Sequence, residues 1–384
     1  MFPKKLQEKI TQRQTQNVLR KLGESNDLID FSSNDYLGFS KNETIFNLAH
    51  QYLIDADLKQ NGATGSRLLS GNQPLYNEVE TMLCKFHHTE SALIFNSGYN
   101  ANLGFFASVP QRGDVVIYDE YIHASIRDGM KLSNAKAYKF KHNNLEDLEQ
   151  KILRSALNDN CNIYIVTESI FSMDGDSPDL VNMSQICKKH QAHLVVDEAH
   201  AVGVFGENGE GLIQQLHLEK AIFARIITFG KALGSHGAAI LGSQELKQYL
   251  INFARSFIYT TALPPHALAT IKSSYNELVL QSENGISQRE KLKKNIAFFK
   301  AKVHENHLKN HFIESVSPIQ SCIIKGNEKV KTISKLLLEN GFDVKPILSP
   351  TVPESQERLR FCLHSFNSEK DIKNVLNELS KFLK

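Results

Sequence analysis

Short apolar stretches recur through the middle of the chain, and segments with helical spacing separate most of them. We expect each stretch to be a buried strand, and the predicted strands are Ala92–Phe95, Asp114–Tyr118, Asn162–Thr167, His193–Asp197, Arg225–Phe229 and Ala238–Leu241. Strands that alternate with helices are typical of a mostly parallel sheet covered on both faces. The pattern therefore predicts a large α/β domain.

The two ends of the chain have different patterns. Apolar residues with helical spacing predict an amphipathic helix over residues 4–22, ended by Gly23, and a short extended piece follows over 28–39. From about residue 310, apolar runs lie between helical patterns, as in a small α+β domain. We therefore predict an N-terminal helix and extended segment (1–40), a large α/β domain (41–285) and a small C-terminal α+β domain (286–384).

The composition is that of a globular protein, with 41% apolar and 22% charged residues among 384. The 44 basic and 42 acidic side chains nearly cancel, so no strong field is available to attract nucleic acid or an anionic membrane. Five scattered cysteines without a CxxC pair predict a reducing compartment and neither a zinc site nor disulfides. With no apolar signal segment or membrane-length run, we expect a soluble, cytoplasmic protein without a metal.

An acidic residue ends one of the predicted strands. Asp197 closes the run His193–Asp197, and His200 follows three residues later. Ligands of open α/β sheets gather at the carboxyl ends of the strands. An aspartate there could hold a protonated pyridine nitrogen and keep the ring cationic, so that the ring accepts electrons from a carbanion. An aspartate that caps the following helix is the alternative interpretation.

A lysine between glycines follows the next strand. Lys231 lies between Gly230 and Gly234, whereas most lysines lie on solvated surfaces. A desolvated lysine has a lowered pKa and becomes a nucleophile that forms imines. Thr228, in the same turn, could bind an oxygen of a phosphate. An ordinary surface lysine is the alternative.

Two further segments suit a cofactor that carries a phosphate and a ring. Ser97 and Gly98 open a predicted helix, whose free N–H groups and dipole favour a phosphate, although many helices begin with Ser-Gly. His123 follows the strand that ends near Tyr118, so its imidazole could lie flat on a pyridine ring. A histidine that merely starts a helix is the alternative interpretation.

Polar residues near two other predicted strands extend the candidate site. Glu168 and Ser172 follow the run Asn162–Thr167 and suggest a polar lip of the site. Arg360 alternates with apolar residues as on a strand, where it would either clamp a carboxylate or lie on the surface of an edge strand.

Nine motifs occur together in one order, and together they are specific: NDYLG (34–38), GATGSRLLSG, NSGYNAN, IHAS, TESIFSMDGD, VVDEAH, TFGKALG, IYTTALPP and PTVPESQERLR. The chain resembles the α-oxoamine synthases, which are pyridoxal-phosphate (PLP) enzymes of fold type I, over about residues 30–365. The resemblance implies a large domain with a mostly parallel sheet, a small α+β C-terminal domain and a homodimer with shared active sites.

Within this family the chain is most similar to the 8-amino-7-oxononanoate synthases of biotin synthesis, although its GSRLLSG loop resembles that of the ligase branch. The similarity implies a decarboxylative condensation of L-alanine with a pimeloyl thioester, carried by CoA or by an acyl-carrier protein. The alternatives are 2-amino-3-ketobutyrate CoA ligase, 5-aminolevulinate synthase and serine palmitoyltransferase. A non-catalytic PLP-binding partner subunit would typically lose the lysine or the aspartate, and both are present here.

The resemblance also implies a role for each matching residue. Lys231 forms the Schiff base and acts as acid and base, Asp197 pairs with the pyridine nitrogen, His200 pairs with the ring hydroxyl and His123 stacks on the ring. The other residues expected around the cofactor are Ser97, Gly98, Tyr99, Ser172 and Thr228, with Thr260 and Thr261 reaching the phosphate of the neighbouring subunit. The residues expected near the substrate are Arg20, Asn34, Glu168, Thr351 and Arg360.

Overall fold

A computed structural model describes residues 2–20, 22, 27–155, 161–283 and 287–383. The chain forms two compact units. Unit 1 comprises Met1–Ser33, Met173–Gly175 and Leu292–Lys384, and unit 2 comprises Asn34–Ser172 and Asp176–Lys291. The domain boundaries predicted after residues 40 and 285 stay a prediction.

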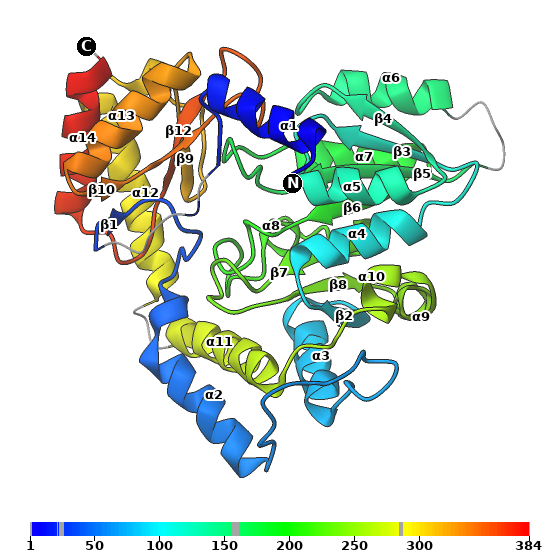
Figure 1. The fold of residues 1–384 in the computed structure, drawn as a ribbon. Coiled ribbons are helices and arrows are strands. Elements are labelled where there is room, and N and C mark those ends of the chain that lie inside the picture. The colour runs from blue at the N-terminus through cyan, green and yellow to red at the C-terminus, as the bar shows by residue number, and fades with distance from the viewer. Residues whose placement is uncertain (1, 21, 23–26, 156–160, 284–286, 384) are drawn as a thin grey trace. The chain divides into compact units, whose positions relative to one another are not determined.

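The described part of unit 2 contains a seven-stranded sheet (Figure 1), with the order β2-β8-β7-β6-β5-β3-β4. The pairs β7–β6, β6–β5, β5–β3 and β3–β4 are parallel, and β8 runs antiparallel to both of its neighbours. The prediction of a mostly parallel sheet is therefore confirmed. The strands are β2 Ser91–Phe95, β3 Val115–Asp119, β4 Lys136–Phe140, β5 Ile163–Glu168, β6 His193–Asp197, β7 Ala224–Thr228 and β8 Ala238–Gly242.

Helices cover the sheet of unit 2, and Figure 1 shows α4 and α5 side by side over it. Phe105 of α4 packs in one apolar cluster with Val166 of β5 and Val195 of β6. The alternate strand residues Ile165 and Val196 are fully buried as well, so both faces of the sheet are covered. The helices are α2 Glu43–Asp55, α3 Pro74–Phe86, α4 Gly98–Ser108, α5 Ala124–Leu132, α6 Leu145–Ser155, α7 Leu180–Lys189, α8 Leu212–Gln215, α9 Gln244–Phe253, α10 Arg255–Ile258 and α11 Pro265–Glu283, with short 3₁₀ turns at Phe39–Lys41 and Glu219–Ala221.

Unit 1 contains an antiparallel sheet of order β11-β12-β9 and a parallel pair formed by β1 and β10. Helix α13 packs against β11, β12 and α14. The strands are β1 Ile29–Asp30, β9 Ile319–Ile323, β10 Phe342–Asp343, β11 Lys345–Ile347 and β12 Arg358–Cys362, and the helices are α1 Lys4–Thr15, most of α12 Gln288–Glu305, α13 Asn327–Glu339 and α14 Glu369–Leu383, with a 3₁₀ turn at Lys309–His311.

The N-terminal helix is shorter than predicted. It ends at Thr15 instead of Leu22, and Asn17 adopts a left-handed φ of 52°, which a helix cannot continue through. None of its residues is buried, so no packing extends the helix. Gly23, the predicted end, lies outside the described residues.

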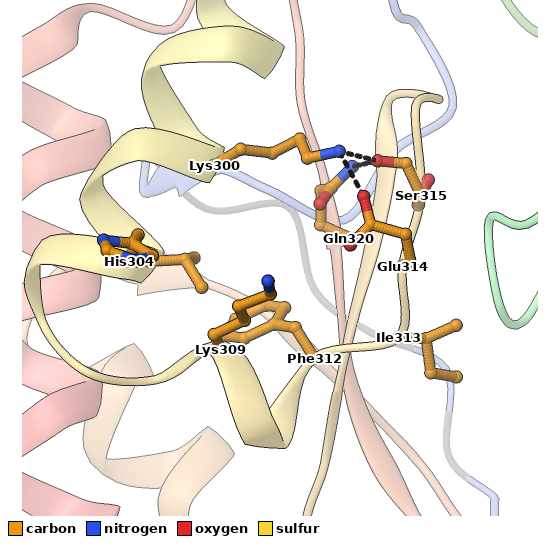
Figure 2. A pocket seen from close by; sticks show the side chains of 9 residues that line it. Lys300, His304, Lys309, Phe312, Ile313, Glu314, Ser315 and Gln320 are labelled. Atoms are coloured by element: carbon orange, nitrogen blue, oxygen red, sulfur yellow. Dashed lines mark hydrogen bonds and ion pairs between the residues drawn. The ribbon is translucent and has the colours of Figure 1, made fainter.

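A small pocket of about 240 Å³ lies in unit 1 (Figure 2). Lys300 of α12 donates there to the carboxylate of Glu314 and to the carbonyl of Ser315, at 2.6 and 3.0 Å. None of the residues predicted for the functional site lines this pocket. Among the described residues, no helix combines the length and apolar character that crossing a membrane requires.

Candidate active site

The parallel strands of unit 2 end at a common edge of the sheet. Glu168 ends β5, Asp197 ends β6 and Thr228 ends β7, and Glu168 and Asp197 are direct partners in the strand register. Glu168 and Asp197 are 3% and 6% exposed, which is unusual for carboxylates. The predicted residues therefore gather where open α/β sheets bind their ligands.

Lys231 lies in a chain of polar contacts within unit 2. Its Nζ is 2.6 Å from Nε2 of His200, and Nδ1 of His200 is 2.7 Å from the hydroxyl of Tyr36. The Tyr36 hydroxyl donates to the side-chain oxygen of Asn34 at 3.1 Å. With Tyr36 donating to Asn34, His200 donates from Nδ1 and accepts from Lys231 at Nε2. The contacts hold the lysine nitrogen beside the end of β6.

A second polar network surrounds Asp197. One oxygen accepts from the backbone of Ala199 and the other from the side-chain amide of Asn102, both at 2.9 Å. Asn102 also donates to Ser125, whose hydroxyl is 2.7 Å from Nδ1 of His123. Burial lowers the pKa of His123, the charge of Lys231 lowers it further, and Asp197 opposes both. His123 is therefore held as a neutral ring joined to Asp197 through two neutral side chains.

Glu168 is the most strongly perturbed acid of the site. Burial and the neighbouring charge of Asp197 raise the pKa of its carboxyl to about 8, although Lys231 and the backbone amides of His123 and Ser172 work in the opposite direction. One oxygen of Glu168 is buried without a hydrogen-bond partner. A carboxyl that retains its proton near neutral pH is typical of a functional site.

Replacing Glu168 with glutamine should stabilise the apoprotein at alkaline pH. Since folding raises the pKa of Glu168 above its unfolded value, the folded chain retains a proton that the unfolded chain releases, and stability falls as the pH rises from about 4.5 to about 8. Glu168→Gln removes this loss, by about 4–5 kcal/mol above pH 8 and by little below pH 5. Urea unfolding of both apoproteins at pH 5 and pH 8.5 measures the difference, and an equal gap at both pH values would contradict the assignment.

The start of α4 forms a turn suited to a phosphate. The hydroxyl of Ser97 caps the helix by accepting from the amide of Asn100 at 3.1 Å. A Cβ on Gly98 would stand 3.8 Å from the side chain of Thr228, so the two residues lie against each other. The first amides of a helix have no acceptor within it, which leaves them for an anion.

Three other residues predicted around the cofactor lie near this turn. The side-chain amide of Asn96, directly before Ser97, donates to the hydroxyl of Thr260 at 3.0 Å and to the carbonyl of Thr261 at 2.6 Å. Tyr99 is half exposed and donates to Asp128 at 2.8 Å. That Thr260 and Thr261 reach the phosphate of a second subunit stays a prediction.

The cluster fits a cofactor with a cationic ring and a phosphate. Asn102 and Glu168 each have a buried side-chain oxygen without a hydrogen-bond partner, which marks polar capacity that the protein itself does not use. Asp197 supplies a buried carboxylate for a ring cation, and the start of α4, beside Thr228 at the end of β7, supplies backbone amides for the phosphate. Lys231 contributes an amine to this cluster.

Arg20, Thr351 and Arg360 belong to unit 1. Arg360 lies on β12, is 8% exposed and approaches the sulfur of Cys362 at 2.9 Å. Thr351 and Arg20 are exposed. Their part in binding a substrate stays a prediction.

Sequence reasoning missed the residues that connect the site. Tyr36, Asn102 and Ser125 lie inside motifs that the sequence singles out, but none was expected in the site. The spacing of Asn102, four residues after Gly98, places it one helical turn further on the same face of α4 and could have indicated its position.

A family model for aminotransferases of class I and II matches residues 26–379, so the chain belongs to this family. It is 39% identical to the 8-amino-7-oxononanoate synthase of Emericella nidulans over 369 residues, which cover 92% of this chain and 89% of that protein. Among solved structures, the 8-amino-7-oxononanoate synthase of Francisella tularensis aligns with a TM-score of 0.77 at 31% identity, covering 94% of this chain and 98% of that one. A serine palmitoyltransferase variant from S. paucimobilis with a bound PLP–myriocin aldimine aligns with a TM-score of 0.88 at 26% identity, covering 99% and 96%. The predicted fold, α/β of PLP-dependent fold type I, is confirmed.

Proposed function

We propose that this chain uses PLP to condense L-alanine with a pimeloyl thioester, with loss of CO₂, to give 8-amino-7-oxononanoate for biotin synthesis. The observation that carries the proposal is the gathering of Lys231, His200, Asp197, His123 and Glu168 at one edge of the sheet. The similarity to 8-amino-7-oxononanoate synthases over nearly the whole chain supports the same reaction.

When bound, PLP supplies an electron sink that stabilises a carbanion at Cα of the amino acid. Asp197 holds the pyridine nitrogen in its protonated form, because a buried carboxylate favours a neighbouring cation. His123 would lie against the ring of bound PLP, and His200 would bind the ring hydroxyl. Ser172 would lie beside the ring, and Ser97, Gly98, Tyr99 and Thr228 would bind the phosphate.

Lys231 moves the proton of the reaction. Its Nζ anchors the cofactor, removes the proton from Cα of alanine and returns a proton to Cα at the end. His200, 2.6 Å from this nitrogen, keeps it in place and offers a polar partner when the amine is released.

The condensation balances without a further reagent. A bond forms between Cα of alanine and the carbonyl carbon of the thioester, the carbon–sulfur bond breaks, and the thiol leaves. The carboxyl group of alanine leaves as CO₂, and a proton takes its place at Cα. Asn34, Glu168 and Thr351 contribute to binding of the substrates, and Arg360 and Arg20 supply the positive charge for carboxylate groups.

The proposal extends to the assembly and the location of the protein. Two copies form a homodimer in which Thr260 and Thr261 of each chain contribute to the phosphate site of the other. The acyl group arrives on CoA or on an acyl-carrier protein, and the enzyme works in the cytoplasm.

Condensation of serine with a palmitoyl thioester is a second candidate, supported by the structural similarity to serine palmitoyltransferase. Its acyl chain is long and uncharged, whereas a pimeloyl group ends in a carboxylate. An arginine that binds the acyl group would therefore favour the pimeloyl group.

The holoenzyme should release thiol and CO₂ in equal amounts when it receives both L-alanine and pimeloyl-CoA, and neither product when one substrate is missing. The same assay with glycine or serine, and with palmitoyl-CoA, compares the alternatives. Turnover that requires serine and palmitoyl-CoA would replace the proposed reaction by the second candidate. No thiol release with any pair would contradict both.

A further inference from the structure

His142 lies between two carboxylates close to the candidate site, and the proposed function gives it no role. It follows β4, and its Nδ1 is 2.9 Å from Asp119 at the end of β3. Its Nε2 is 2.8 Å from Asp176, which follows β5. The three side chains come from segments more than twenty residues apart in sequence, so the fold itself assembles them.

The ring of His142 is held as a cation. Burial opposes its charge, but the hydrogen bonds and charges of Asp119 and Asp176 outweigh burial and raise its pKa to about 10. The ring of Tyr121 stacks on it at 4.4 Å between centroids, and the edge of Phe171 meets it at 4.5 Å. With both nitrogens protonated, His142 donates to both carboxylates at once.

Asp119 and Asp176 each also bind backbone of a segment that leads to the site, Asp119 through its carboxylate and Asp176 through its main-chain carbonyl. Asp119 accepts from the amide of Tyr121 at 2.8 Å, and Tyr121 stands two residues before His123. The carbonyl of Asp176 accepts from the amide of Phe171 at 3.0 Å, and Ser172 is the next residue. His142 therefore joins the segment that ends at His123 to the segment that carries Ser172.

The two segments converge on one carboxyl group. The backbone amides of His123 and Ser172 both act on Glu168, where they favour its ionised form. Glu168 ends β5 and is fixed by the sheet, so the distance of the amides from it depends on how the segments are held. Asn143 supports the same arrangement, since its backbone donates to Asp119 at 2.8 Å and its side chain donates to Asp176 at 2.7 Å.

We propose that His142 is a positioning residue, which holds the amides of His123 and Ser172 against Glu168 and thereby aligns His123 with the cofactor ring. The second part rests on the proposed function, whereas the first concerns the protein alone. His142 touches neither substrate nor reacting atoms in this proposal. It acts through Asp119 and Asp176 and the segments that these two residues hold.

A double-mutant cycle on the apoprotein tests the first part. At pH 8.5 Glu168→Gln should raise the unfolding temperature, because it removes a buried carboxyl that is ionised there. In the His142→Gln background the amides no longer compensate this charge as well, so the pKa of Glu168 rises further. The rise in unfolding temperature from Glu168→Gln should then be larger and should keep growing to higher pH than in the wild-type background. Since no hydrogen bond joins His142 to Glu168 among the described contacts, a purely local structural role predicts the same rise in both backgrounds, and that result would overturn the proposal.

The holoenzyme tests the second part. His142→Gln should keep the absorbance band of the lysine-bound cofactor but lower kcat about 10- to 100-fold, with KM for L-alanine changed less than about threefold. An unchanged kcat in His142→Gln would overturn the proposal that His142 aligns His123 with the cofactor ring. A wild-type enzyme that does not use L-alanine would refute the proposed function and leave the apoprotein cycle intact as a test of His142.

Two further variants serve as a control and as a substitute for His142→Gln. His190→Gln breaks another histidine–carboxylate pair of unit 2, between His190 and Glu149 at 2.9 Å, and should change neither the cycle nor kcat. If His142→Gln does not fold, Asp176→Asn replaces it as the test variant. This change weakens the ion pair of His142 with the more exposed carboxylate, Asp176, while the contact of His142 with Asp119 remains. The same outcomes then decide the proposal.

Discussion

Replacing Lys231 with alanine should abolish turnover and the absorbance band of the lysine-bound cofactor. Proton transfer by a positioned side chain contributes about 10²–10⁴-fold to a rate, and the same nitrogen also anchors the cofactor, so we expect a loss of at least about 10⁴-fold. The phosphate turn and Asp197 stay in place, and the variant should still bind PLP without the covalent attachment. Spectra of the reconstituted protein and the thiol-release assay measure both effects.

Lys189→Ala is the matched control for this prediction. Lys189 belongs to the same unit, lies 67% exposed and pairs with Glu149 at the end of α7, away from the strand ends. This variant should keep the band and the turnover of the wild type. Retained turnover in Lys231→Ala would remove Lys231 from the chemistry and, with it, the proposed function.

The strand ends explain why much of the site was predictable. Asp197, Glu168 and Thr228 each follow an apolar run, and such runs identify themselves by composition alone. Because parallel strands end at one edge, predicting the strands also predicts that these side chains meet. The glycines on either side of Lys231 are not typical of a surface lysine, and they therefore indicated that Lys231 belongs to the site.

The parts that sequence reasoning missed lack an apolar signal or depend on distant partners. Strand β4 lies at the edge of the sheet, and only Phe140 of its five residues is buried, so no hydrophobic pattern indicates it. His142 follows this strand, and its partners stand 23 and 34 residues away. The residues next to His142 in the sequence therefore do not indicate that it will lie between two carboxylates.

The N-terminal helix shows the opposite error. Helical spacing predicted a helix to residue 22, but Leu6 and Ile10 are 46% and 37% exposed. An isolated helix gains little from spacing alone, because most helical stability in proteins comes from burying an apolar face. Periodicity therefore located the helix and overestimated its length.

Replacing Asp197 with asparagine should lower turnover by about 10²–10⁴-fold while the cofactor stays attached. Removing one partner of a buried charge pair costs about 3–5 kcal/mol, which corresponds to this range of rates if the pair forms between Asp197 and the ring cation. Asparagine keeps the shape and the contact with Asn102 but cannot hold the ring nitrogen in its protonated form. Lys231 and the phosphate turn are untouched, so the absorbance band should remain, shifted by the change in ring charge.

The apoprotein provides a second signature of Asp197 that does not depend on turnover. Because the charge of Asp197 helps to raise the pKa of Glu168, Asp197→Asn should move the pH range in which the apoprotein loses stability to lower values. Asp114→Asn is the control, since Asp114 is also buried but caps the opposite end of β3 by accepting from Asn162 and Gln111. If the turnover of Asp197→Asn lies within about threefold of that of Asp114→Asn, the two buried carboxylates contribute equally to turnover. That result would show that Asp197 does not act on the cofactor ring.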